Sequence, residues 1–460
     1  MIPLAHALIG REDLPIPAWL FAWGASLVLI VSFFALSAGW RTARFEADGW
    51  RPLGARLSRW LINPATEAIA GLIAVGLLAL TVWAGLHGTE APDRNFSLTF
   101  VFVTVWLGFA ALSVLLGDVF RAFNPWRAVG RAVGAGFAAL AGQSPRRLPY
   151  PERLGRWPAT LGLIAFVWLE LVYGTSGTSV GLEPETAAVA VLVYSGYTLA
   201  AMALFGVERW CDRGETFSVY FNMFSQLAPL EVRDRRLGVR RPFSAATRWA
   251  AVPGSIALVV ASIATTAFDG AQEGALQDAI EDVFEWLVDA GLGLTTALRL
   301  TDTLFLALVL AGIAAVFLLG VRGMGSVRGS PSAGRLRTAF AHTLIPIAFA
   351  YLVAHYFSLF VFQEQAQFTY LLSDPLGDGS DIFGTASSGI DYGLIGVTAV
   401  WYVQVAALVI GHVVGLTLAH DRAIAVYGDY RDAARSQYWM LAVMVAFTCF
   451  GLYLLSQANQ

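Results

Sequence analysis

Three polar side chains stand inside long apolar runs of this sequence, where an ionisable group is costly unless it has a partner. They are Glu170 in FVWLELVYG, His355 in YLVAHYFSLF and Gln404 in WYVQVAALV. An imidazole and a carboxylate suit a transition metal such as zinc, and an open coordination position would activate water or polarise a phosphoryl oxygen. We therefore expect one polar pocket with Glu170 and His355 as catalytic groups and with His355, Glu170 and Gln404 as ligands of a divalent metal. The alternative is that these groups only form hydrogen bonds between helices.

Further histidines could add to this chemistry. His6 and His87 lie close to predicted spans and could supply nitrogen ligands, although lone histidines at a membrane surface are more often solvated. Tyr351, Tyr356 and Tyr402 are neighbours of the pocket residues in the sequence. His420 precedes Asp421 and Arg422, so we expect it to be a cation that complements the dipole at a helix C-terminus.

His342 and His412 form a second predicted layer, near the other ends of the spans that carry His355 and Gln404. Two histidines on neighbouring helices can bind a b-type haem between them, so this pair is a candidate cofactor site. A second haem would need another histidine opposite His355, and the sequence offers Gln404 there. A zinc-like metal is therefore favoured over haem.

The elements that position these residues are long apolar runs. The chain has 460 residues, of which 57% are hydrophobic and 14% charged, and its mean hydropathy is +0.62. These values indicate a single all-α domain, residues 1–460, that lies in a lipid bilayer as a polytopic helix bundle. About ten runs are long enough to cross a membrane. They cover residues 18–38, 65–86, 98–116, 157–173, 186–207, 249–268, 303–321, 339–362, 394–419 and 438–455.

The arginines predict the orientation of these spans, because basic residues collect in cytoplasmic connections. The chain has no lysine, and 27 of its 30 arginines fall in alternate connections, starting with the one after the first span. Only Arg11, Arg94 and Arg299 fall in the others. We therefore expect a multi-pass protein of the cell membrane with both termini outside and the arginine-rich loops in the cytoplasm. The arginines are explained by topology and by anionic lipid, so no nucleic-acid partner is expected.

Three connecting segments have helical periodicity. Residues 124–142 predict an interfacial helix whose Arg127 and Arg131 reach lipid headgroups. Residues 214–230 predict an aromatic segment that packs at the inner interface or re-enters the bundle. Residues 272–290 predict an acidic amphipathic helix over the outer mouth, within a segment whose acidic residues begin at Asp269, directly after the span that ends at Phe268.

Several strings along nearly the whole chain resemble polytopic membrane proteins of the fenitrothion hydrolase family. They are WLELVY, GETFSVYFNMFSQLAPL, AHTLIPIAFAYLVAHYFSLFVFQEQ, GHVVGLTLAHDRA and AHALIGREDLPIPAWLFAWG. The resemblance implies hydrolysis of an organophosphotriester, an apolar small molecule that would enter from the bilayer. A transporter or channel for a small solute or cation is the first alternative, since Glu170 could bind a translocated ion or proton. A haem-containing electron-transfer subunit with His342 and His412 is the second.

Overall fold

The protein is a bundle of apolar helices in a computed structural model that describes residues 18–174, 181–272, 274–327 and 329–458. Within these residues, eight helical segments are long and apolar enough to cross a membrane. They are Ala55–His87, Phe96–Leu116, Pro184–Phe205, Ser255–Gln272, Leu294–Met324, Ala333–Ser373, Val397–Tyr427 and Tyr430–Tyr453. The other two predicted runs contain shorter apolar helices, Trp23–Gly39 and Trp157–Tyr173. An all-α bundle suited to a lipid bilayer is therefore confirmed.

The elements of the first half are α1 (Ala18–Gly39), β1 (Arg51–Pro52), α2 (Ala55–Leu61), α3 (Pro64–His87), α4 (Phe96–Thr99), η1 (Phe100–Gly108), α5 (Phe109–Leu116), α6 (Phe120–Phe123), α7 (Pro125–Ala141), α8 (Trp157–Trp168), η2 (Leu169–Tyr173), α9 (Pro184–Phe205), α10 (Val207–Arg213) and α11 (Thr216–Ser225). Those of the second half are β2 (Leu230–Arg233), β3 (Arg236–Val239), η4 (Ala246–Arg248), α12 (Ser255–Gln272), α13 (Gln277–Asp289), α14 (Leu294–Met324), α15 (Ala333–Phe340), η5 (Ala341–Leu344), α16 (Ile345–Phe368), α17 (Tyr370–Ser373), α18 (Val397–Tyr427) and α19 (Tyr430–Ala458).

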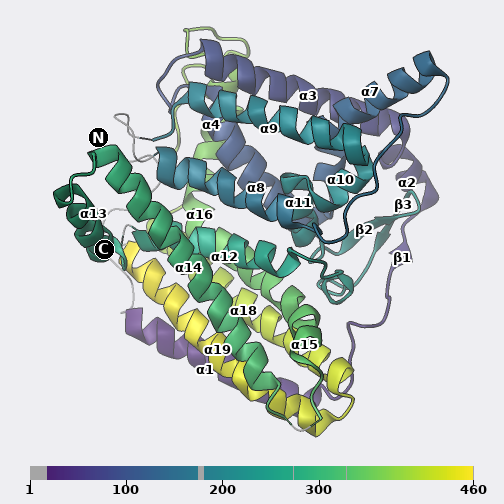
Figure 1. Cartoon of the computed structure of the whole chain (residues 1–460), viewed down its shortest axis with the longest axis vertical. Helices are drawn as coiled ribbons and strands as arrows, with labels where there is room; N and C mark the ends of the chain where they lie inside the picture. Colours follow the sequence, from purple (N-terminus) through teal and green to yellow (C-terminus); the bar gives the residue numbers. More distant parts are fainter. Residues whose placement is uncertain (1–17, 175–180, 273, 328, 459–460) are drawn as a thin grey trace.

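Helix α12 forms the centre of the bundle. In its most apolar window 83% of the residues are buried, against 22% to 56% in the other candidate spans. It packs against α8 on one side and against α14, α16 and α19 on the other. In Figure 1, α3, α8 and α9 lie above it, α1 and α19 lie below, and α14 runs diagonally from the upper left to the lower middle. A polar group on α12 therefore meets protein rather than lipid.

The two ends of the bundle differ in charge. A small antiparallel sheet of order β1-β3-β2 lies at one end together with α2 and α7, at the right of Figure 1. We call this the arginine-rich end. Helix α13 lies at the opposite end and carries five acidic residues, so we call that the acidic end. Its apolar side packs on α14 through buried Ile280 and half-buried Val283, which agrees with the predicted amphipathic helix at residues 272–290, of which residue 273 is not described.

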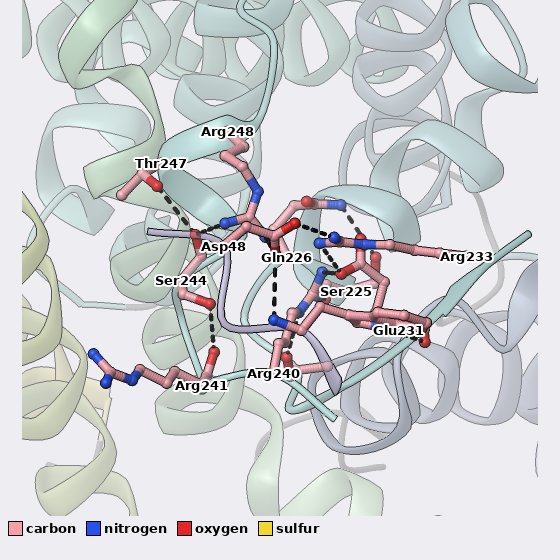
Figure 2. Close-up of polar contacts among 12 residues, drawn as sticks. Asp48, Ser225, Gln226, Glu231, Arg233, Arg240, Arg241, Ser244, Thr247 and Arg248 are labelled. Carbon is pink, nitrogen blue, oxygen red and sulfur yellow. Dashed lines mark hydrogen bonds and ion pairs between the residues drawn. The ribbon is translucent and has the colours of Figure 1, made fainter. Parts of the chain in front are cut away.

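Ion pairs join the sheet to the chain that follows α1. Asp48 pairs with Arg233 and Arg248, and Glu231 pairs with Arg233 at 2.7 Å and with Arg240 at 2.9 Å (Figure 2). Arg240 is almost completely buried and also donates to the carbonyl oxygens of Ala228 and Ser225. This cluster fixes the sheet to the helices and uses arginines that the sequence alone assigns only to topology.

The predicted role of His420 as a helix-terminal cation is wrong. Helix α18 continues to Tyr427, and His420 is completely buried with its Nε2 3.1 Å from the carbonyl oxygen of Trp40. The neighbouring Asp421 accepts hydrogen bonds from the Trp40 indole and from the backbone N–H groups of Arg44 and Phe45. Both side chains therefore attach the loop after α1 to α18.

The segment 124–142 forms α7, as predicted, with Asn124 accepting a hydrogen bond from the N–H of Arg127 at the helix N-terminus. Leu140 is 93% exposed, which fits contact with a membrane surface. The expectation that Arg127 reaches lipid is wrong, because its side chain is buried and pairs with Glu208 of α10 at 2.6 Å. Arg131 is half-exposed and pairs with both Glu208 and Glu67.

The aromatic segment 214–230 contains the short helix α11, and this helix is buried as predicted. Glu215 caps it by accepting hydrogen bonds from the N–H groups of Phe217 and Ser218. Phe221 and Phe224 are completely buried and contact aromatic rings of α5, α6 and α16. Backbone that is not part of a continuous span is tolerated inside a membrane protein only where other helices surround it.

We expect Phe221→Ala to lower the free energy of unfolding by about 3–5 kcal/mol, because it leaves a cavity among packed rings. Unfolding of the purified protein in mixed micelles would measure this change. Phe137→Ala is the control, since Phe137 on α7 is 48% exposed and its loss should change stability by less than about 0.5 kcal/mol. Equal stability of the two variants would contradict tight packing of α11.

Candidate functional site

A histidine, an aspartate and a tyrosine meet between the two central helices α12 and α16. The Nε2 atom of His355 lies 2.9 Å from Oδ2 of Asp269, and the hydroxyl of Tyr356 donates to the same oxygen at 2.5 Å. Asp269 is 2% exposed, so its carboxyl group relies on these protein partners rather than on water. The rings of His355 and Tyr356 are 4.5 Å apart and nearly perpendicular. Neighbouring residues on α16 thus hold one carboxyl group from two sides.

The local sequence of α12 permits this contact. The helix continues beyond Phe268 to Gln272, which places Asp269 inside the span instead of in the acidic segment expected from the sequence. Gly270 follows, and a Cβ atom at this position would lie 3.3 Å from His355 Nδ1. A glycine next to the aspartate therefore lets the imidazole approach the backbone of α12.

Glu170 lies beside this group on a widened turn of helix. It belongs to η2, a π-helical segment that ends the α8 span, and such segments are often found at functional sites. Its carboxyl group is close enough to Asp269 and Tyr356 to interact with both electrostatically. Its Oε2 atom is buried and has no hydrogen-bond partner among the described residues. Asp269 thus contacts His355 and lies in electrostatic reach of Glu170, whereas a shared site of Glu170 and His355 stays a prediction.

A second π-helical segment, η1, closes the other side of the group. The ring of Trp106 in η1 meets the ring of Tyr356 edge to face, with centroids 5.1 Å apart. Its indole N–H donates to the hydroxyl of Tyr220 on α11 at 3.2 Å. The central polar group is therefore connected by side chains to the buried helix α11, which leads to the arginine-rich end.

Another carboxyl group lies on α16 farther toward the acidic end. Glu364 accepts a hydrogen bond from the hydroxyl of Thr104 in η1 at 3.2 Å. It is nine residues beyond His355, about 13 Å along the helix at the usual rise per residue. In the sequence, Glu364 stands in the string QEQ just beyond the predicted end of the span at Phe362, so hydropathy does not mark it as a group at membrane depth.

Gln404 is buried on α18, and its Oε1 has no hydrogen-bond partner among the described residues. Among the described residues, no hydrogen bond joins Gln404 to His355 or Glu170. The described residues also contain no group of three or more His, Cys, Asp or Glu side chains that could hold a metal ion. Metal binding by His355, Glu170 and Gln404 stays a prediction.

The two histidines of the predicted haem site are both buried. His412 Nδ1 lies 2.8 Å from the carbonyl oxygen of Leu408 in its own helix, and the Nε2 atoms of His342 and His412 have no partner among the described residues. Close by, a Cβ atom at Gly415 would lie 2.9 Å from the carbonyl oxygen of Thr343. The two helical segments therefore touch directly, and a haem between them would have to separate them.

The remaining histidines lie outside this group. His87 stacks on Trp83 of the same helix, with ring centroids 4.0 Å apart, and its Nδ1 lies 3.3 Å from the Trp83 carbonyl oxygen. His6 lies outside the described residues.

The group formed by Asp269, His355, Tyr356 and Glu170 can exchange protons. All four side chains are ionisable, and their contacts lie inside the bundle, where a change of charge is costly unless a neighbour compensates it. A histidine oriented by a carboxylate can also act as a general base toward water. Comparison of the chain with protein-family models, with curated proteins and with solved structures gave no match.

Proposed function

We propose that the chain is a membrane transporter or channel that moves protons and that Asp269, His355 and Glu170 bind the proton. The observation that carries this proposal is the contact of His355 and Tyr356 with one oxygen of Asp269, with Glu170 in electrostatic reach. Ionisable groups that pair inside membrane helices mark proton relays and ion pathways in pumps and transporters. A proton needs no cavity, since it moves between groups at hydrogen-bond distance.

Two further features favour transport. Glu364 lies on the same helix between the proton-binding group and the acidic end, about 13 Å from His355 along the helix, so a proton that enters from that side would need waters to bridge this distance. The buried helix α11 resembles the interrupted helices that transporters place next to their binding sites. Trp106 and Tyr220 connect it to the proton-binding group.

Asp269→Asn tests the proton-binding role, because the amide keeps the shape of the side chain but cannot take up a proton. We expect proton flux into proteoliposomes under an imposed pH gradient, followed with an internal pH-sensitive dye, to fall roughly tenfold or more. Glu90→Gln is the control, since Glu90 is an exposed carboxylate in the loop after α3. Wild-type flux in the Asp269→Asn variant would refute the proposal.

We also propose ten spans with both termini outside and the arginine-rich end in the cytoplasm of the cell. The distribution of 27 of the 30 arginines supports this orientation, and the two shorter apolar helices would complete the ten spans.

Single cysteines test this orientation in a chain whose Cys211 and Cys449 are replaced by alanine. A membrane-impermeant maleimide added to intact cells should label Asp282→Cys, which is exposed on α13. It should label Arg236→Cys, exposed on β3, only after the cells are permeabilised. The opposite labelling pattern would reverse the orientation.

A hydrolase is the second candidate, and the hydrogen bond between His355 and Asp269 favours it. The carboxylate would orient the imidazole so that its other nitrogen takes a proton from water. The attacking hydroxide would displace a nitrophenolate from an apolar phosphotriester, the reaction that the resemblance implies. In a different version of this candidate, that nitrogen of His355 would instead ligate a divalent metal together with Glu170 and Gln404, and the metal rather than a free imidazole would activate the water.

Release of nitrophenolate separates this candidate from transport, and His355→Gln tests whether the release depends on this site. If the chain is a hydrolase, the variant should release nitrophenolate from a phosphotriester in micelles about 10²–10⁴ times more slowly than the wild type. His87→Gln should retain the wild-type rate, because His87 lies outside the group. Elemental analysis and chelation of the same samples would test the metal. The absence of nitrophenolate release by the wild type, with or without added zinc, would exclude this activity.

A further inference from the structure

A polar cavity of about 100 Å³ lies at the arginine-rich end, among α6, α7, α10, α11 and the start of α8. It is separate from the proton-binding group. One water occupies about 10–15 Å³ of such space, so the cavity could hold a cluster of waters or one small polyatomic ion. Its charged lining residues are Asp118, Arg121, Arg127, Arg156, Glu208 and Asp212.

Arg156 is the residue that sets the chemistry of this cavity. Its side chain is buried, stacks on Trp249, and donates through Nη1 to the carbonyl oxygen of Ala250 and the hydroxyl of Ser255. No carboxylate pairs with it among the described residues, and its Nε has no hydrogen-bond partner there. Asp212, which lines the same cavity, acts on Arg156 electrostatically but forms no salt bridge with it. A buried guanidinium without a directly paired counter-charge is costly, and an anion in the cavity would supply that partner.

The salt bridges around the cavity concentrate on one carboxylate. A single carboxylate, Glu208, pairs with Arg121, Arg127 and Arg131, and Arg131 shares one further carboxylate, Glu67. The lining has three arginines and three carboxyl groups, and among the described residues only Glu208 forms salt bridges with these arginines. Burial raises the pKa of both Asp118 and Asp212, so uptake of a proton by either group leaves the cavity with a positive charge that favours an anionic ligand.

Asp118, one of the carboxyl groups of the cavity, repels an anion less than a free aspartate would. Asp118 accepts a hydrogen bond from Asn222 at 3.0 Å and has no arginine partner within salt-bridge distance among the described residues. Burial raises the pKa of Asp118, so this group holds a proton more readily than a free aspartate does. A protonated carboxyl group would donate a hydrogen bond to an anion instead of repelling it. Burial lowers the pKa of Arg156 to about 10, which still leaves this guanidinium charged at neutral pH.

We infer that this cavity binds a phosphate group, with Arg156 and Arg121 as its main ligands. The planar guanidinium matches the oxygens of phosphate, and donors from different helices suit a tetrahedral anion. The phosphate could be free inorganic phosphate, or the headgroup of an anionic lipid, because the cavity lies at the end of the bundle near the interfacial helix α7.

The test measures the thermal stability of the purified full chain. In a phosphate-free zwitterionic detergent at constant ionic strength, inorganic phosphate should raise the melting temperature, whereas equal chloride should not. In nanodiscs without free phosphate, a change from phosphatidylcholine to phosphatidylglycerol should raise it if the headgroup is the ligand. Stabilisation in either arm supports the phosphate site, and the arm identifies the source. The absence of stabilisation in both arms would overturn it.

Variants connect the effect to the cavity. Arg156→Gln should weaken phosphate binding at least tenfold, as should Arg121→Gln, which removes a half-exposed ligand and leaves the buried contacts of Arg156 in place. Arg153→Gln is the matched control, because Arg153 is exposed and does not line the cavity. If Arg156→Gln does not fold, the comparison of Arg121→Gln with Arg153→Gln shows whether the cavity binds phosphate. Equal phosphate affinity of these two variants would overturn the assignment.

Discussion

The cost of burying a charge in an apolar helix bundle governs this structure. Asp269 lies on the most buried helix, where neither water nor lipid headgroups can reach it, so neighbouring helices must supply its partners. Helix α16 supplies two of them in consecutive residues, His355 and Tyr356. The positions of α12 and α16 are therefore coupled, and a shift of either helix would leave a carboxyl group unpaired at a cost of several kcal/mol.

Small residues allow the helices to meet this requirement. Gly270 gives the imidazole of His355 access to α12, and Gly411 and Gly415 bring α18 into contact with the helix that carries His355. Between membrane helices the hydrophobic effect offers little driving force, so close packing and hydrogen bonds must stabilise the arrangement. The same glycines would allow small sliding movements, because they present no side chain to interlock.

The spans could be predicted because hydropathy is a local property, whereas the site depends on residues far apart in the sequence. Glu170 and His355 stood out as lone polar residues within apolar runs. Asp269 did not, because an aspartate and a glycine after an apolar run look like the start of a loop. Its partner is 86 residues away, and a single sequence does not indicate that pairing. The expectations for Arg127 and His420 are wrong for the same reason, because their partners Glu208 and Trp40 are also far away in the sequence.

The energetic cost of a charge differs between the arginine-rich end and the surroundings of Asp269. At the arginine-rich end, the half-exposed carboxylate of Glu208 shares several guanidinium groups, and water screens the exposed ones. These charges cost less than a buried one such as that of Arg156. Around Asp269 the packing is closed, with hydrogen bonds and ring contacts on several sides. The His355 side chain is only 12% exposed, so an apolar ester has little surface of it to contact, whereas a proton needs only a change of hydrogen bonds. That difference is the physical reason to rank proton exchange above hydrolysis at this site.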